Sequence, residues 1–332
     1  MGKIKIKFKI VELCKNWQLK LRPASEAELF AVLNQTRLVW GVGVSLEDYL
    51  EYHRLIRWHP WSRENFQHLI LTDEKGQILS SCKTYFHKAK IKNDVVKLCG
   101  IGAVFTPPEF RQKGYATQML SSLLDELKEK GFDLAMLFSD IGTDFYARLG
   151  FQLIEKKDPI YRFVNPLKIS SQVEITEHLP KQIWSWYRSY SQKNDFALLR
   201  PDDYFQLLSE RISWHKRYLG FRSQKVFILK EDKSYLWVDL SRWRLVVRDF
   251  ACGGDEPDIA LYRLLSFIHQ RYPFQEIYGW LPKEFDGYRF LKLKEKRKRQ
   301  KTLLMFCALT EKGRKIFELP PEEIQFWLAD YF

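Results

Sequence analysis

The segment Gly102–Ala116, GAVFTPPEFRQKGYA, constrains the fold of this chain more than any other. It begins as a strand-like run and stops at Pro107, because proline lacks a backbone donor and fixes φ. The turn Arg111–Ala116 then leads directly into an amphipathic helical pattern that ends near Lys130. The first N–H groups of a helix have no intrahelical partner, and the helix dipole favours negative charge there. The segment therefore predicts a strand, a glycine turn and a helix that together bind an anionic group such as a phosphate.

Length and composition favour two domains with sizeable cores. The chain has 332 residues, of which 45% are hydrophobic and 15% aromatic. Residues Lys3–Ile10 alternate lysine with apolar side chains, which is typical of a strand and not of a signal peptide. No apolar run has the length of a membrane span. We expect a cytoplasmic protein without a membrane partner, either a monomer or a homodimer.

The formal net charge of +13 favours an anionic ligand or partner. Part of this charge lies in residues 292–301, KLKEKRKRQK, which contain seven basic residues and one glutamate. We expect a solvated loop or hairpin tip there, with a phosphate- or nucleic-acid-binding patch as the alternative. Aromatic residues do not alternate with these charges, so nucleic acid is the less favoured partner.

The cysteines indicate neither a disulfide framework nor a metal site. There are five, without a CxxC motif, and the histidines also lack the spacing of metal ligands. Neither Cys82 nor Cys99 has an evident histidine partner, which disfavours covalent catalysis. We expect reduced, buried thiols and no metal.

Hydrophobic periodicity predicts a mixed α/β domain over the first half of the chain. Two capped helices are expected at Glu26–Trp40 and Ser45–Arg57, because Ser25 and Ser45 are each followed three residues later by an acidic residue. Three strands follow, the last at about Val95–Phe105, and then the glycine turn and its helix. A short strand, a short helix and a final strand complete the order β-α-α-β-β-β-α-β-α-β.

The second half repeats this coarse order, which suggests a diverged internal duplication. Two helices, three strands joined by short turns, a helix and two further strands are expected after the loosely patterned segment Arg162–Gln172. We therefore place the domains at residues 1–165 and 166–332. Each is expected to have a mixed, mostly antiparallel sheet flanked by helices.

Three motifs together resemble the GNAT acyltransferase superfamily. They are the strand that ends at Val104-Phe105, the turn Arg111-x-x-Gly114-x-Ala116, and the later Phe145-Tyr146-x-x-x-Gly150-Phe151. The match covers roughly residues 17–155. A narrower similarity, in VFTPPEFRQKGYA and Leu137–Gly142, is to the fungal lysine N6-acetyltransferase-like subgroup. The second half resembles a degenerate GNAT-like domain.

The resemblance implies acetyl-CoA as co-substrate, bound through its pyrophosphate by the glycine turn and through its pantetheine arm by the preceding strand. The coenzyme-binding residues it implies are Ala103, Val104, Phe105, Arg111, Gln112, Lys113, Gly114, Tyr115, Ala116, Thr117 and Phe145. Gly114 allows close backbone approach to the phosphates, and Ala116 keeps the helix start uncrowded. The alternative is an ordinary strand-to-helix turn without a ligand.

Tyr146 is where the resemblance places a general acid for the leaving thiolate, with simple packing as the alternative. The general base is less defined. Asp140 is the first candidate because it ends a strand where the sheet opens, whereas Asp144 and Glu109 lie near the same cleft. A water relay, or the terminal carboxylate of Phe332, is also open, although packing is the favoured explanation of the apolar C-terminus.

The second half lacks the phosphate turn. Its third strand is followed by Ala251-Cys-Gly-Gly-Asp-Glu-Pro-Asp258, whose acidic residues would repel a pyrophosphate. We expect one active site per chain, with the second domain closing a substrate pocket. The predicted activity is transfer of an acetyl group to a primary amine, with lysine or a polyamine favoured over a protein lysine. The alternative is a non-catalytic module that senses acyl-CoA or binds nucleic acid or protein.

Overall fold

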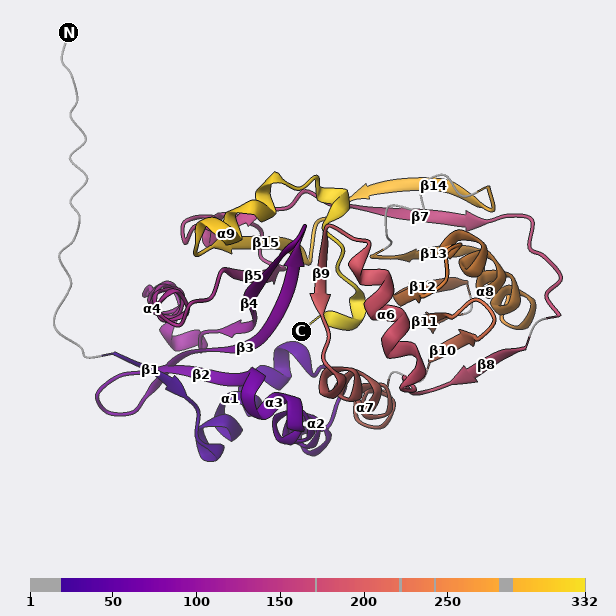
Figure 1. Ribbon diagram of the computed structural model, residues 1–332. Helices are drawn as coiled ribbons and strands as arrows, with labels where there is room; N and C mark the ends of the chain where they lie inside the picture. The colour runs from indigo at the N-terminus through magenta and orange to yellow at the C-terminus, as the bar shows by residue number, and fades with distance from the viewer. Residues whose placement is uncertain (1–18, 171, 221–222, 242, 281–288, 332) are drawn as a thin grey trace, which may run out of the picture.

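The computed structural model describes residues 19–331 except 171, 221–222, 242 and 281–288. The strand expected at Lys3–Ile10 and the terminal residue Phe332 lie outside the described residues. The chain forms two β-sheets side by side, each with helices packed against it (Figure 1). The last described residues lie between the two sheets, near the centre of the molecule (Figure 1).

The first sheet provides the frame of the glycine turn. Its strands are β1 (Lys20–Pro23), β2 (Phe66–Thr72), β3 (Ile78–Ile91), β4 (Asp94–Phe105), β5 (Leu134–Ser139), β6 (Gln152–Leu153), β9 (Phe196–Leu199) and β15 (Leu303–Ala308). The order is β1-β2-β3-β4-β5-β15-β6, and β9 pairs with the end of β3. Strands β4 and β5 are parallel, whereas the other pairs are antiparallel. The sheet is therefore mixed and mostly antiparallel, as predicted.

Helices cover both faces of this sheet. Successive residues of a strand point to opposite faces, so Leu69 and Leu71 of β2 pack with the apolar side of α4 (Tyr115–Glu129), whereas Ile70 packs with α1 (Glu26–Trp40). The other helices of the first half are α2 (Leu46–Trp58), α3 (Pro60–Asn65), α5 (Asp144–Ala147) and the 3-10 turn η1 (Pro108–Phe110). No helix in the described part of the chain is long and apolar enough to cross a membrane.

The second sheet repeats the plan of the first. Its strands are β7 (Lys157–Phe163), β8 (Val173–Thr176), β10 (Gln224–Leu229), β11 (Ser234–Leu240), β12 (Arg244–Cys252), β13 (Glu276–Gly279) and β14 (Leu291–Lys298), in the order β14-β7-β13-β12-β11-β10-β8. Three antiparallel strands lead through a helix to a parallel strand, β13 beside β12, just as β4 leads through α4 to β5. The accompanying helices are α6 (Gln182–Gln192), α7 (Asp202–Tyr218) and α8 (Pro257–Arg271).

The two halves exchange strands. Strand β7 precedes residue 165 but lies in the second sheet beside β13, while β9 and β15 come from the second half and lie in the first sheet. The last strand, β15, is followed by α9 (Glu311–Arg314), η3 (Lys315–Glu318), η4 (Pro321–Glu323) and η5 (Leu328–Asp330). The division at residue 165 remains a prediction, and the two sheets do not follow it strictly.

The basic segment is not the loop that was expected. Residues 291–298 form the edge strand β14, which pairs with β7 along most of its length. Its side chains from Lys292 to Lys298 are exposed, so the expected solvation is correct. Alternating lysines on an edge strand also oppose pairing with another chain, which accounts for a strand of this composition.

Candidate active site

The glycine turn has the predicted arrangement of strand, turn and helix. Strand β4 ends at Phe105, the 3-10 turn η1 follows, and α4 begins directly after Gly114. Gly114 has φ +84° and ψ 0°, a left-handed conformation that favours glycine, and an added Cβ there would meet nothing within 4 Å. Glycine is therefore needed for the backbone conformation and not because neighbouring atoms crowd it. Arg111 stabilises the turn through a hydrogen bond from Nε to the Thr106 carbonyl of 3.1 Å.

The start of α4 presents free backbone donors. The hydrogen bond from Gln118 N–H to the Gly114 carbonyl, 3.0 Å long, begins the regular helical series. The N–H groups of Tyr115, Ala116 and Thr117 precede this bond and therefore have no intrahelical acceptor. Gly114 has no side chain that could cap them. This end of α4 combines free donors with the positive end of the helix dipole.

A β-bulge opens the sheet next to this turn. Lys83 of β3 is opposite Gly102 and Ser81 is opposite Phe105, so Ala103 and Val104 together occupy the place of one residue. Ala103 has φ +47°, which marks the bulge. Pairing between β4 and β5 ends at Ile101. The backbone groups of residues 103–105 thus face a gap where β4 and β5 separate, as the sequence predicted.

A cavity of about 680 Å³ connects the bulge, the start of α4 and the short helix α5. The predicted residues that line it are Val104, Phe105, Arg111, Gln112, Gly114, Tyr115, Ala116, Thr117, Phe145 and Tyr146. Ala103, Lys113 and Asp140 are not among the lining residues. Lys113 instead lies over the ring of Phe110, 5.4 Å from its centroid.

Sequence reasoning missed one wall of this cavity. Val39 and Trp40, at the end of α1, line it from the side, and the Trp40 ring lies 6.3 Å from that of Phe105. Both side chains are about half exposed. The available signal was the apolar run at the end of α1, since a helix that ends in solvent is expected to end in polar residues.

Tyr146 lines the cavity from α5. Its side chain is buried between the rings of Phe145 and Phe151, with centroid distances of 4.8 and 6.0 Å. Burial raises the pKa of the phenol to about 12, and the nearby Cys82 and Asp140 add to the shift. The hydroxyl has no hydrogen-bond partner among the described residues. Tyr146 therefore remains protonated at neutral pH and free to donate.

Asp140 lies near Tyr146 but is tied to the backbone. Its Oδ1 accepts a hydrogen bond from the N–H of Thr302 of 2.8 Å, which fastens the entry of β15 to the end of β5. Its negative charge also raises the pKa of both Tyr146 and Tyr331. The side chain of Asp140 is exposed. Thus Asp140 has a structural contact and is also close to the candidate acid.

The C-terminal segment reaches the end of β5 from the second half. The ring of Tyr331 lies 5.2 Å from that of Phe138 and 5.9 Å from that of Trp280. Arg211 of α7 donates a hydrogen bond of 3.2 Å to the Tyr331 carbonyl. Whether the carboxylate of Phe332 acts in catalysis stays a hypothesis, because that residue lies outside the described ones.

Basic side chains gather on the sheet face that is turned toward the second half. Lys83 lies directly opposite His68, one residue from the bulge, and His53 of α2 is close to both. Burial lowers the pKa of Lys83 to about 7, with a smaller contribution from the charge of Arg211. Neither ring nitrogen of His53 or His68 has a hydrogen-bond partner. Burial also holds the pKa of both histidines well below the usual value, so they are neutral at neutral pH.

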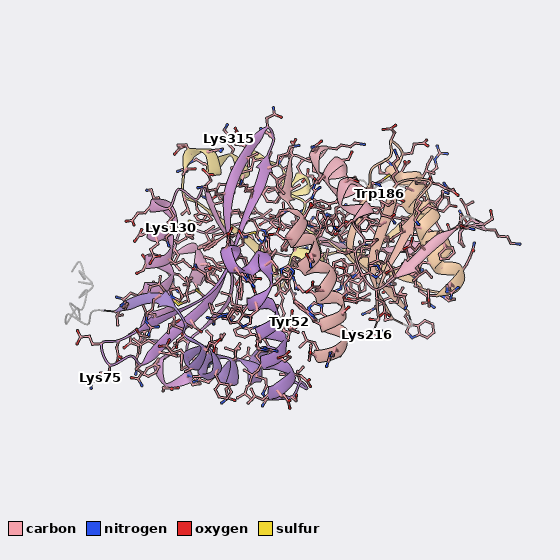
Figure 2. All side chains as sticks on the ribbon, turned by 60° about the horizontal axis from the view of Figure 1, so that its bottom comes forward. Tyr52, Lys75, Lys130, Trp186, Lys216 and Lys315 are labelled. Carbon is pink, nitrogen blue, oxygen red and sulfur yellow. The ribbon has the colours of Figure 1, made fainter. Side chains whose placement is uncertain are left out.

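The two halves meet beside this face. Tyr52 of α2 and His215 of α7 share a buried hydrogen bond of 2.9 Å, and Figure 2 labels Tyr52 at this junction. Helices α2 and α7 thereby hold the second half against the first. Arg211, on the same helix as His215, lies near enough to Lys83 to contribute to its lowered pKa.

The thiols do not have the properties of nucleophiles. Cys82, Cys99, Cys252 and Cys307 are buried and free. Burial raises the pKa of Cys82 to about 12 and holds that of Cys99 well above its usual value. A thiol with a raised pKa is a weak nucleophile at neutral pH. No group of metal-ligating side chains occurs within the described residues.

Helix α8 occupies the position in the second half that α4 has in the first. It begins with Pro257, which lacks an N–H, and Asp258 lies in its first turn. Its preceding residue, Glu256, makes no side-chain cap. These features fit the prediction of one coenzyme site per chain, which remains a prediction.

Comparisons with known proteins agree on one family. Residues 20–154 match the model of the acetyltransferase (GNAT) domain. A lysine acetyltransferase from Yarrowia lipolytica is 29% identical over 141 residues, which cover 35% of this chain and 36% of that relative. The chain therefore spans about a third of the length of this curated relative.

Solved structures show the fold over most of the chain. A GCN5-related N-acetyltransferase from Anabaena variabilis superposes on 89% of this chain and 74% of its own, with a TM-score of 0.67 and 16% identity. One from Kribbella flavida covers 89% and 73%, with a TM-score of 0.63 and 14% identity. Eis1 from Mycobacterium abscessus covers 88% and 73%, with a TM-score of 0.59 and 15% identity.

Proposed function

We propose that this chain is an acyltransferase that transfers an acetyl group from acetyl-CoA to the primary amine of a small molecule, because its residues 20–154 match the model of the acetyltransferase (GNAT) domain. One observation carries this proposal. A single cavity joins the free N–H groups of α4, the bulged end of β4 and the protonated phenol of Tyr146. These are the three functions that acyl transfer from a thioester needs: an anion site, carbonyl polarisation and a proton donor.

The chain holds acetyl-CoA through its backbone. The N–H groups of Tyr115, Ala116 and Thr117 bind the pyrophosphate, and Arg111 and Gln112 flank it. Residues 103–105 lie beyond the last residue of β4 that pairs with β5, and their backbone groups bind the pantetheine arm. Acetyl-CoA supplies the acetyl group as a thioester, whose oxygen the backbone donors of this strand polarise.

Tyr146 gives its proton to the departing sulfur. A phenol with a pKa of about 12 is a weak acid for an ordinary thiolate in water. Burial raises thiol pKa values in the same core, since that of Cys82 is also about 12. Desolvation in the same way makes a thiolate that forms beside Tyr146 more basic than one in water, which favours the proton transfer.

The amine must lose a proton before it attacks, because free amines are protonated at neutral pH. We assign this proton to Asp140, which is exposed to water and lies electrostatically close to Tyr146. The terminal carboxylate of Phe332 is the alternative base, since Tyr331 reaches the same end of β5. With either base, the amine attacks the thioester directly in a ternary complex, and no acyl-cysteine forms.

The charge on the acceptor side favours an amine that also carries an acid group. Arg211 and the protonated fraction of Lys83 would repel a polyamine but attract a carboxylate. Free lysine fits this description, and the similarity to a lysine acetyltransferase agrees with it. A protein lysine remains the alternative acceptor.

Thiol release from acetyl-CoA with a panel of amines tests the activity. Gly114→Glu places a carboxylate at the start of α4 and is expected to abolish thermal stabilisation by acetyl-CoA. Gly76→Glu is a matched control, because Gly76 has φ +78° and equally open surroundings in the distant β2–β3 turn. Persistent stabilisation of the Gly114 variant would place the pyrophosphate elsewhere. Absence of turnover with every amine, together with salt-sensitive nucleic-acid binding, would favour the non-catalytic alternative.

A further inference from the structure

A second cavity, of about 540 Å³, lies at a break in the outer edge of β3. Strand β2 pairs with β3 as far as Tyr85, and β9 pairs with it from Lys88 onward. Phe86 and His87 lie between these two ladders and line the cavity. The other walls come from α3, α6 and the segment after β9. Its volume is in the range of small-molecule sites, about 300–1,000 Å³.

This cavity is separate from the coenzyme site. The residues that line the two cavities do not overlap. Lys97, on its rim, and Ala103, at the bulge, are six residues apart on β4, which corresponds to about 20 Å along a strand. A ligand here would not contact the groups assigned to acyl transfer.

The floor of the cavity is aromatic, with one unsatisfied polar group. The rings of Phe86 and Phe132 have centroids 5.1 Å apart, and Trp61 lies 5.1 Å from His87. His87 is only 7% exposed, and its Nε2 has no hydrogen-bond partner. A buried, unpartnered nitrogen costs free energy unless something binds it. The cavity therefore suits a ligand with an apolar body and at least one polar end.

Two lysines at the cavity indicate which charge the polar end of the ligand carries. Lys88 and Lys97 are directly opposite each other on β3 and β4, so their side chains lie on the same face. Like charges in this position destabilise a sheet. Neither ammonium group forms an ion pair with a described residue, because the nearby Asp133 accepts instead from the Lys97 backbone and the Thr310 hydroxyl.

Two arginines also line the cavity, and Arg200 is paired with Asp249 and Asp330. The other, Arg188 of α6, is paired with Asp202. The lining residues include no aspartate or glutamate. The exposed lysine pair, without an acidic residue in the lining, gives this end of the cavity a positive charge that favours an anion.

We propose that this cavity binds a small carboxylic acid with an apolar body. Lys88 and Lys97 hold the carboxylate, and the body lies on Phe86, Phe132 and Trp61. The ligand stabilises the lysine pair and fills the break between β2 and β9. Nothing in this site participates in the acetyl transfer, so the proposal does not depend on that activity.

Isothermal titration of the full chain, with CoA present at saturation, tests the site. The probes are 4-phenylbutyrate and 4-phenylbutanol, which share the aromatic body and differ in charge. We expect the carboxylate to bind about tenfold more tightly than the alcohol, the ratio that one charge-assisted contact provides. Equal affinity of the two probes, or no binding of the carboxylate at millimolar concentration, would overturn the proposal.

Substitutions at the cavity test whether the two probes bind there. Lys88→Gln and Lys97→Gln should each weaken 4-phenylbutyrate binding by about five- to tenfold and leave the alcohol unchanged. Gln192→Trp, an exposed position on the cavity wall, should block both probes without disturbing the core. Lys75→Gln removes an equivalent charge from the β2–β3 turn, at the edge of the molecule in Figure 2, and should change nothing. Unaltered carboxylate binding in both lysine variants would also refute the proposal.

Discussion

Arg200 holds Asp330 through two buried hydrogen bonds, from Nε to Oδ1 at 3.0 Å and from Nη2 to Oδ2 at 2.6 Å. Its remaining nitrogen, Nη1, binds Asp249 at 2.5 Å, and Tyr235 donates to the same carboxylate. The guanidinium also stacks on Tyr187, 3.9 Å from the ring centroid. One side chain of the second half thereby fixes the C-terminal segment that reaches β5.

We predict that Asp330→Ala lowers the free energy of unfolding by about 3 kcal/mol, since Arg200 keeps Asp249 as its counter-charge but its buried Nε and Nη2 lose their hydrogen-bond acceptors. Urea unfolding measures this. Asp202→Ala breaks the exposed pair with Arg188 and serves as the control, with an expected loss below about 1 kcal/mol. Equal losses in the two variants would show that the Arg200 network adds little to stability.

Tyr146→Phe should reduce turnover by about 100-fold or more, because it removes the proton donor and keeps the ring that packs on Phe145 and Phe151. Initial rates of thiol release measure it, with circular dichroism as a check on folding. Tyr115→Phe removes a phenol from the same cavity but leaves the backbone N–H in place. Comparable activity in the two variants would show that Tyr146 is not the proton donor.

Asp140→Asn distinguishes the two candidate bases. The amide oxygen still accepts the Thr302 N–H, so the entry of β15 is preserved while the carboxylate is lost. If Asp140 is the base, turnover falls by about 100-fold and deletion of Phe332 has a smaller effect. The reverse order of effects, measured with saturating amine, would assign the base to the chain terminus.

Local sequence patterns predicted the glycine turn and its helix correctly. They did not predict which strands of one half pair with strands of the other. The capping box of Ser25 and Glu28 is present as predicted, and so is the left-handed Gly114 before α4, because both depend on residues a few positions apart. The pairing of β15 with β5 joins residues about 170 positions apart and leaves no mark in local periodicity. Strand β7 was missed for the same reason.

In the candidate site, too, the residues within local motifs were predicted and those that depend on long-range packing were not. The sequence indicated Tyr146 and the phosphate turn because family motifs carry them. Lys83 was not recognised, since a single lysine in an alternating strand reads as a solvent-facing residue. It is covered by the second half of the chain, which only the packing of α2 against α7 reveals.

Lys83→Met tests the acceptor. If Lys83 binds a carboxylate of the amine substrate, the variant should raise KM for free lysine by about tenfold. The KM for lysinamide, which has no carboxylate, should stay the same. An equal change for both substrates would mean that Lys83 affects the site only through packing.

The same variant changes the pH dependence of stability. Lys83 has a pKa of about 7 in the folded chain and about 10.4 when unfolded, so between these values the unfolded state binds one more proton. The free energy of unfolding therefore increases with pH across that window, and it decreases as the pH falls toward 7. Lys83→Met should lower the slope of unfolding free energy against pH by at most about 1.4 kcal/mol per unit, measured by urea unfolding at about pH 7.5, 8.5 and 9.5. Lys75→Met, at an exposed turn, should keep the wild-type slope, and an unchanged slope in the Lys83 variant would show that this lysine is not desolvated by the second half.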